Sequence, residues 1–433
     1  MKDRTVDRRQ VVQGLAAGAA LAAGGAGLAS AVFPTPAIAK PSGEPIVLGL
    51  TISQTAAAGV ADHQDHFNGS TLAMEEINAA GGILGRPLQF KVVDVDLLNA
   101  ESCQAAIRSL VDQKVHAISS PFLFVPIPAM DASVAYGCPY VNGNTQRAAT
   151  DLTAAHPDKY GHIFQMDPSE VYYGETFPIF LQDLEKSGAW KPKNNKVHIV
   201  QEQIAYNQTI SRSCQEALKK SRFELAAVTD IQYPVQDWGP VIQKIKEVGA
   251  GTVMIDHWVA AEYAAFVKQF RSNPLKDSLV YLQYGPSQPE FLELAGRAAE
   301  GFVWSTVLGV YADEKGKAFR DKYKKRFPGK VMGLCYTGAG YDIVHMMKDV
   351  WEKTGKPEDF KANCAALREG AFRGVCGWSI MGNKRQEAVQ YPVGTQDVEK
   401  GMSQLYFQVQ SRESKIIYPF ALKETEYKTV PWA

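Results

Sequence analysis

Short apolar runs alternate along the chain with longer segments whose apolar residues recur at helical spacing. Ile46–Ile52 (IVLGLTI) is typical of a buried strand, and Leu88–Asp96 (LQFKVVDVD) alternates at first as a strand should. Between later strands, Cys103, Ile107 and Leu110 fall on one helical face. Alternating strands and helices predict parallel sheets covered by helices on both faces.

The alternation occurs in two runs. The first starts at Ile46 and ends with the strand PYVNG, and the second starts at His162 with HIFQM. We therefore predict an α/β fold of two doubly wound parallel-sheet lobes. Further helices are expected at 318–327, 335–354 and 360–369, and the segments QLYFQVQ and KIIYPFA near the end predict a strand pair.

Residues 1–39 have the pattern of a cleaved signal peptide. Four basic residues precede an uncharged run from Gln10 to Phe33, and Ala37 and Ala39 in PTPAIA have the A-x-A spacing of a cleavage site. The adjacent Arg8 and Arg9 indicate twin-arginine export to the periplasm, although the usual bulky Phe after them is absent. A membrane anchor is the alternative, but a run so rich in Ala and Gly makes a poor span.

The charge balance argues against a nucleic-acid partner. The chain has 46 basic and 46 acidic residues, and removal of the signal would leave 42 basic and 44 acidic residues, a net charge of −2. There is no basic surplus to attract phosphates. The remaining 394 residues suggest two or three domains.

The sequence displays no catalytic constellation, so we expect neither an enzyme nor a cofactor. It has no G-x-x-x-x-G-K-[ST] loop and no G-x-S-x-G elbow. The segment HQDH (His63–His66) has a spacing that suits a metal, but no third ligand lies at a recognisable spacing. We interpret it as a solvated loop or a loop at the rim of a cleft, and expect no metal site.

Six cysteines remain without a C-x-x-C pair, which argues against zinc or redox chemistry. Export would permit disulfides, and Cys364 with Cys376 is the best local pair. Buried free thiols are an equally good interpretation.

Several motifs appear in the order found in one protein family. They are FNGSTLAMEEINAAGGILGRPLQFKVVDVD, FQMDPSEVYYGE, YPVQDWGPVIQKIKEVGAGTVMI, PEFLELAGRAAEGFVWST, YTGAGYDIV and FRGVCGW. Together they resemble type I periplasmic solute-binding proteins of ABC importers, in the branched-chain amino acid and amide (Leu/Ile/Val-binding-like) family. The resemblance extends from Ile46 to about Asn383, and the last 50 residues match poorly.

The resemblance implies two lobes joined by a hinge of three crossing strands, with a ligand held between them. Lobe one would comprise residues 46–162 and 286–375, and lobe two residues 163–285 and 376–433. The protein would be a monomer that delivers its solute to a membrane permease. A solute-sensing receptor with the same fold is the alternative.

The resemblance also places candidate ligand residues. The loop after the fourth strand of lobe one falls on Phe122–Phe124, with Leu123 where Ser or Thr is usual. The other positions fall on Asn144 and Thr145 in the next loop, Tyr206, Trp258, Glu262 as the partner of a ligand amine, and Asp62 beside His63 at the rim. Each of these residues also has a purely structural explanation, such as packing for Tyr206 and Trp258, or a first-turn acid for Glu262.

The apolar loop at Phe122–Phe124 bears on the ligand. Without a hydroxyl it lacks the side-chain hydrogen bond that the family gives an α-carboxylate, a loss of roughly 1.5–3 kcal/mol. We therefore expect an aromatic acid, an amide, an amine or an alcohol-like solute rather than a plain aliphatic amino acid. Branched-chain amino acids remain the alternative.

Overall fold

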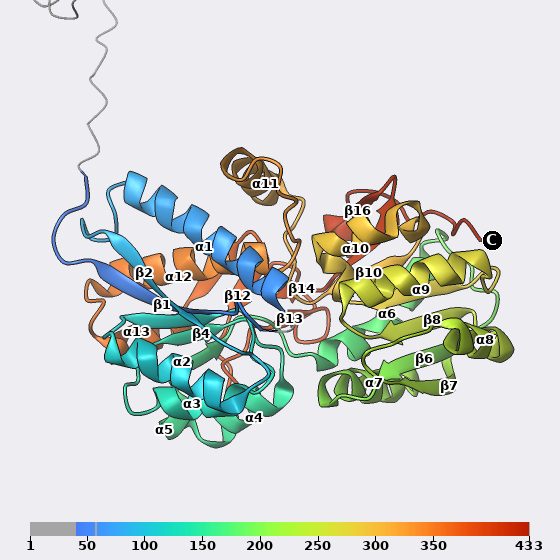
Figure 1. Cartoon of the computed structure of the whole chain (residues 1–433), viewed down its shortest axis with the longest axis horizontal. Helices are drawn as coiled ribbons and strands as arrows, with labels where there is room; N and C mark the ends of the chain where they lie inside the picture. Colours follow the sequence, from blue (N-terminus) through green and yellow to red (C-terminus); the bar gives the residue numbers. More distant parts are fainter. Residues whose placement is uncertain (1–39, 57–58, 433) are drawn as a thin grey trace, which may run out of the picture. The chain divides into compact units, whose positions relative to one another are not determined.

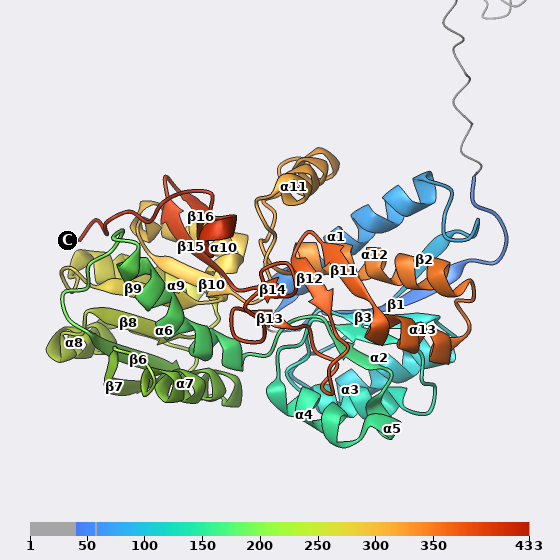
Figure 2. The ribbon, with the colours of Figure 1, turned by 180° about the vertical axis from the view of Figure 1, so that it is seen from behind.

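The computed structural model describes residues 40–56 and 59–432. The predicted signal peptide, residues 1–39, lies outside the described residues. The rest of the chain folds around two sheets, each of which, with its helices, we call a lobe (Figures 1 and 2).

Lobe one contains a five-stranded sheet in the order β2-β1-β3-β4-β5, with every neighbouring pair parallel. Its strands are β1 (Ile46–Ile52), β2 (Leu88–Asp94), β3 (Ala117–Ser120), β4 (Tyr140–Asn142) and β5 (Ile163–Gln165). Helices α1 and α12 cover one face, and α2 and α3 cover the other (Figures 1 and 2). The helices of this lobe are α1 (Val60–Ala79), α2 (Ala100–Asp112), α3 (Pro126–Ser133), α4 (Arg147–Ala155), α5 (Pro157–Tyr160), α12 (Tyr336–Thr354) and α13 (Phe360–Glu369).

Lobe two contains a seven-stranded sheet in the order β16-β15-β10-β9-β8-β6-β7. Its strands are β6 (Lys196–Glu202), β7 (Glu224–Ile231), β8 (Thr252–Asp256), β9 (Leu279–Gln283), β10 (Val303–Thr306), β15 (Leu405–Gln410) and β16 (Glu413–Tyr418). Its helices are α6 (Val171–Lys186), α7 (Ala205–Leu218), α8 (Gly239–Val248), α9 (Ala260–Ser272) and α10 (Pro289–Ala295). The strand pair expected in the tail is confirmed, since β15 and β16 extend the sheet in antiparallel fashion.

The five parallel strands of lobe two repeat the order of lobe one. Strands β7-β6-β8-β9-β10 correspond in sequence order to β2-β1-β3-β4-β5. Doubly wound sheets of this order bind ligands outside the carboxyl ends of their strands, where the strand order reverses. The α/β fold with two parallel-sheet lobes is therefore confirmed.

The chain passes between the two sheets three times. The connections are residues 166–170 after β5, residues 307–335 around α11 (Glu314–Arg326), and residues 381–404 around the short pair β13 (Gln390–Tyr391) and β14 (Met402–Ser403).

The sheets divide the chain differently from the expected lobe boundaries. Strand β5, which we assigned to lobe two, pairs with β4 in lobe one, and β10, assigned to lobe one, lies between β9 and β15 in lobe two. The hairpin β11 (Ala371–Gly374) and β12 (Gly377–Ile380) packs beside α12. Pairing of parallel strands is decided by contacts distant in sequence, so local patterns do not define it.

The HQDH segment is a helix rather than a loop. Helix α1 begins at Val60, directly after Gly59, whose φ is 77°. Both histidines are fully buried: the Nδ1 of His63 accepts the Ser53 N–H at 2.9 Å, and the Nε2 of His66 lies 3.2 Å from the Ser119 hydroxyl. The interpretation as a rim loop is therefore wrong, because these polar side chains find partners inside the lobe.

Helices α1 and α12 approach each other through glycine. A Cβ atom at Gly69 would lie 1.9 Å from the Thr337 carbonyl oxygen, and one at Gly340 would lie 2.1 Å from the His66 carbonyl oxygen. All six cysteines lie within the described residues, and each is a buried free thiol, so Cys364 and Cys376 form no disulfide.

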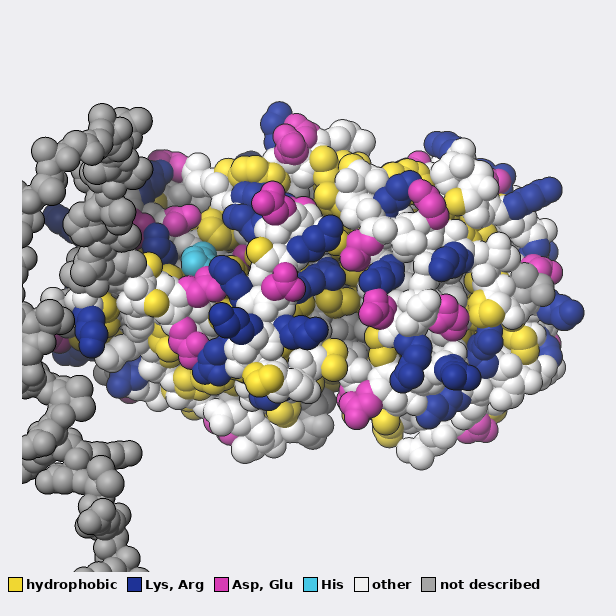
Figure 3. Space-filling model, turned by 90° about the horizontal axis from the view of Figure 1, so that it is seen from above, with side chains coloured by type: hydrophobic (Ala, Val, Ile, Leu, Met, Phe, Trp, Pro, Cys, Tyr) yellow, Lys and Arg dark blue, Asp and Glu magenta, His cyan; other side chains and the backbone are white. Residues whose placement is uncertain are grey.

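Within the part of the chain that the structure describes, no helix is both long enough and apolar enough to cross a membrane. On the face seen in Figure 3, positive and negative side chains are interspersed and hydrophobic side chains lie in small groups.

Candidate functional site

A cavity lies between the two lobes, with an empty volume of about 440 Å³, part of it open to solvent. Its lining is mostly aromatic. The lining residues are Phe122, Phe124, Thr145, Gln146, Asp167, Tyr173, Tyr206, Trp258, Tyr284 and Tyr336.

Most of these residues directly follow the carboxyl ends of parallel strands. Phe122 and Thr145 come after β3 and β4 of lobe one, while Trp258 and Tyr284 come after β8 and β9 of lobe two. The repeated strand order thus brings loops from both lobes to one place, as expected for this kind of sheet.

The aromatic rings contact one another across the cavity. The rings of Phe122 and Phe124 lie 5.7 Å apart edge to face, and Phe122 lies 5.2 Å from the Tyr336 ring. Phe124 of lobe one lies 5.1 Å from Trp258 of lobe two. This last contact joins the two lobes directly.

Two tyrosine hydroxyls of the lining donate hydrogen bonds to the protein rather than pointing to a ligand. Tyr336 donates to the Gly143 carbonyl oxygen at 3.0 Å, and Tyr284 donates to Asp62 at 2.7 Å. Burial raises the pKa of both phenols well above its usual value, so both remain neutral. Their rings therefore serve the cavity as apolar surfaces.

The other two tyrosine hydroxyls are also engaged. The Tyr206 hydroxyl accepts the Gln283 amide at 3.1 Å, and the Tyr173 hydroxyl lies 3.4 Å from the Thr306 hydroxyl. Tyr206 retains its own O–H as a donor, because in this bond it accepts.

Asp167 is the acidic group of the cavity lining. Its side chain is 2% exposed, and its Oδ1 atom has no hydrogen-bond partner among the described residues. Burial, and then the nearby Glu387 carboxylate, raise the pKa of Asp167 well above its usual value. A buried carboxylate oxygen without a partner is costly, so it marks a place where a ligand can contribute a donor.

Two further polar atoms of the lining are buried without a partner within the described chain. They are the Oε1 atom of Gln146 and the indole Nε1 of Trp258. The cavity lining therefore has unused acceptors on Asp167 and Gln146 and unused donors on Trp258 and Tyr206.

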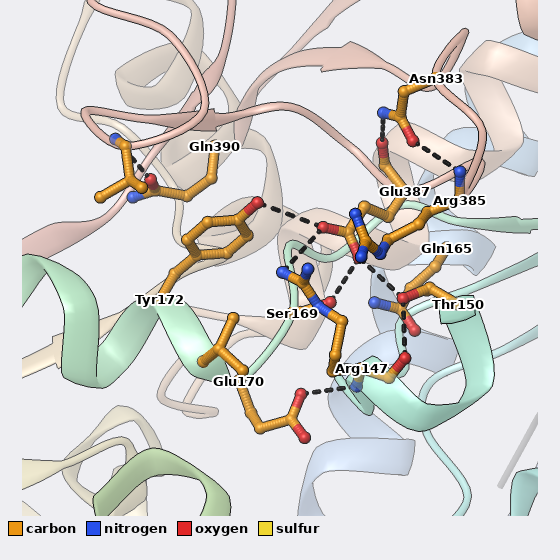
Figure 4. Close-up of polar contacts among 12 residues, drawn as sticks. Arg147, Thr150, Gln165, Ser169, Glu170, Tyr172, Asn383, Arg385, Glu387 and Gln390 are labelled. Atoms are coloured by element: carbon orange, nitrogen blue, oxygen red, sulfur yellow. Dashed lines mark hydrogen bonds and ion pairs between the residues drawn. The ribbon is translucent and has the colours of Figure 1, made fainter. Parts of the chain in front are cut away.

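Glu387 anchors the connections on which the cavity rests (Figure 4). Its carboxylate lies 3.3 Å from Arg147 and accepts hydrogen bonds from Thr150 at 2.9 Å and from Ser169. Ser169 belongs to the first connection between the lobes and Glu387 to the third, so this cluster ties both connections to the start of α4. The backbone that carries Asp167 is fixed there.

Four of the predicted ligand residues line the cavity: Phe122, Thr145, Tyr206 and Trp258. The structure brings them together from separate loops of both lobes.

The other four predicted residues do not line the cavity. Leu123 is fully buried in the core, and its N–H donates to the Asn144 side chain at 2.6 Å, so both hold the loop in shape. Asp62 lies behind the wall, where it accepts hydrogen bonds from Tyr284 and, at 2.8 Å, from Gln288.

Glu262, expected to pair with a ligand amine, faces the protein instead. It accepts the Val235 N–H at 2.9 Å and lies 3.1 Å from the Nε2 of His257. The Nδ1 of His257 in turn lies 2.6 Å from Glu202. This buried imidazole between two carboxylates supports the loop that presents Trp258.

Sequence reasoning missed Gln146, Asp167, Tyr173, Tyr284 and Tyr336 as lining residues. Asp167 and Tyr173 lie in the motif FQMDPSEVYYGE, and Tyr336 begins YTGAGYDIV. Those motifs carried the family resemblance, and their positions at strand and helix ends were the available signal.

Comparison with known proteins agrees with this architecture. Residues 45–401 match the model of a family described as periplasmic binding protein. The chain belongs to that family. It is 22% identical over 307 residues to Leu/Ile/Val-binding protein homolog 3 of Brucella melitensis, which covers 70% of this chain and 77% of the relative.

Solved structures of the family superpose well on this chain. One from Silicibacter pomeroyi, assigned to branched-chain amino acid ABC transport, is 29% identical with a TM-score of 0.84, covering 90% of this chain and 100% of the other. The substrate-binding protein LivJ of Streptococcus pneumoniae, in complex with isoleucine, is 18% identical with a TM-score of 0.69, covering 86% and 98%. These likenesses agree with the two-lobed α/β fold described above.

Proposed function

We propose that this protein captures a small organic solute between its two lobes and delivers it to the permease of an ABC importer. The observation that carries the proposal is the cavity whose aromatic walls come from both lobes, with Phe124 and Trp258 in contact across it. A solute there would contact both lobes at once only when they are closed.

The mechanism follows from that geometry. Because contacts with both walls exist only in the closed form, the solute shifts the lobes toward closure. The three connections act as the hinge, and the closed form is the one that docks on the permease. No bond in the solute is made or broken.

The solute that fits best has an apolar or aromatic body and an N–H group, as in an amide or an amine. Seven of the ten lining residues are aromatic, which favours an apolar body. The unpartnered oxygens of Asp167 and Gln146 favour a solute that donates hydrogen bonds. An aromatic acid, which the sequence left open, would bring a carboxylate to a site that already holds Asp167.

A branched-chain amino acid is the second candidate. It is favoured by the printed names of the relatives and of the solved structures. Its carboxylate would have to be served by neutral donors, namely Thr145, the Tyr206 hydroxyl and the Trp258 indole N–H, because among the described lining residues there is no Lys or Arg.

A thermal-shift screen of the purified protein against amides, amines, aromatic acids and branched-chain amino acids tests the proposal. A solute at 100 times its dissociation constant adds about 2.7 kcal/mol of stability. A shift with amides or amines supports the proposed class, and a shift with leucine or valine supports the second candidate. If no small solute shifts the transition, the proposal fails.

We further propose that residues 1–39 are removed on export to the periplasm by the twin-arginine route. Replacing Arg8 and Arg9 by Lys should then leave the uncleaved chain inside the cell, whereas unchanged export would contradict this route.

A further inference from the structure

We infer that the cavity selects a solute with a positively charged nitrogen and no carboxylate, with Asp167 as its counter-charge. This inference deepens the proposed function and rests on it, since it names the class of solute that the same cavity takes.

The first support is the charge of the lining. Asp167 is buried, one of its oxygens has no partner within the described residues, and the ten lining residues include no Lys, Arg or His. Arg147 is the cation on the neighbouring helix, but it lies 3.3 Å from Glu387 and over the Tyr172 ring. Asp167 is therefore left for a cation that the solute supplies, and that cation would favour the ionised carboxylate over the neutral form that burial favours in the empty cavity.

The second support is the arrangement of aromatic rings. Two phenylalanines, a tryptophan and four tyrosines line the cavity, and all four tyrosine hydroxyls contact protein groups. The rings are thus held in place. Aromatic rings attract an ammonium group through their electron-rich faces.

The third support is what the cavity offers to an anion. A solute carboxylate would lie beside Asp167, and two neighbouring carboxylates repel each other when both are ionised. The lining offers a carboxylate only neutral donors, the Trp258 indole N–H and the hydroxyls of Tyr206 and Thr145, and no cation to balance its charge. A free amine or quaternary ammonium avoids this repulsion, and an amino acid does not.

Calorimetric titration of the purified protein near neutral pH with four matched probes tests the inference. The probes are benzylamine, benzyl alcohol, benzoate and leucine. We expect benzylammonium to bind about ten-fold or more tightly than benzyl alcohol, and benzoate and leucine to bind more weakly still. Equal or tighter binding of benzoate or leucine overturns the inference.

Two variants locate the charge. Asp167→Asn keeps the shape and one acceptor oxygen but removes the charge, so it should weaken benzylammonium binding about ten-fold and leave benzyl alcohol unchanged. Asp151 is an exposed residue of α4 that pairs with Arg385 and does not line the cavity. Asp151→Asn should therefore change the affinity for neither benzylammonium nor benzyl alcohol. Equal loss for both probes in Asp167→Asn would show a structural role and overturn the inference.

The probe series on the unmodified protein decides the matter if Asp167→Asn fails to fold. If benzyl alcohol, benzoate or leucine binds more tightly than benzylamine, the inferred selection of a cationic solute is refuted, while the proposed capture of a solute still stands. Failure of all four probes counts against both this inference and the proposed function.

Discussion

At the scale of single residues, Trp258 shows what decides whether a side chain forms the site. It follows β8, is 8% exposed, and lies 5.1 Å from Phe124 of the opposite lobe. Its neighbour His257 is buried and never reaches the cavity. Of these two adjacent residues, Trp258 forms part of the cavity wall and His257 supports the loop that carries Trp258.

Replacing Trp258 by Ala should weaken solute binding about ten-fold or more, because the wall that lobe two contributes is lost. Trp258→Phe should keep most of the affinity, since a ring remains. Titration with the solute that gives the largest thermal shift measures both. As a control, Trp190→Ala removes a buried indole that stacks on Phe223 and is not part of the cavity lining. It should lower stability without changing affinity.

His257 should make stability depend on pH. Burial lowers the pKa of His257, but hydrogen bonds to Glu202 and Glu262 outweigh it, so the net shift is upward. A raised pKa means that the stabilisation is complete below the unfolded value of about 6.5 and is lost as pH rises through the folded value. The free energy of unfolding, measured with urea over this pH range, should fall more steeply with rising pH for the wild type than for His257→Gln. Parallel curves would contradict the ion pairing.

The family resemblance predicted four of the residues that line the cavity, three of them in loops that follow parallel strands and Tyr206 at the start of α7. It could not predict which way each side chain points. Leu123 and Phe122 are neighbours in one loop, yet Leu123 turns into the core. Glu262 was misplaced for the same reason, since its partners Val235 and His257 come together only in the folded chain.

At the scale of helices and strands, the close approach of α1 and α12 at Gly69 and Gly340 fixes how these two helices of lobe one pack against each other. Gly340→Ala should lower the free energy of unfolding by about 3 kcal/mol or more, because the new methyl group would meet the His66 backbone carbonyl, which cannot move as a side chain can. Chemical denaturation measures the change. Asp349→Ala, at an exposed position of α12, should stay within about 0.5 kcal/mol.

Most elements could be predicted from the sequence because each one has its own pattern. Strand β1 and helices α12 and α13 agree with the predicted ranges within one residue at each end. The start of α1 was missed because the polar segment HQDH was expected to be a loop, whereas it lies in α1 with both histidines buried. The assignment of β5 and β10 to sheets failed because either sheet could accept a short apolar strand.

At the scale of the whole molecule, function depends on the two lobes acting on one solute. The duplicated strand order places ring-bearing loops of each lobe at the same cavity, and the cluster around Glu387 ties together two of the connections between lobes. The lobes thus form two halves of one site.

The most direct test is a crystal structure of the protein with the solute that gives the largest thermal shift. We expect this solute to lie in the cavity and to contact Phe124 of lobe one and Trp258 of lobe two at the same time. A solute bound to one lobe alone, or outside the cavity, would contradict it.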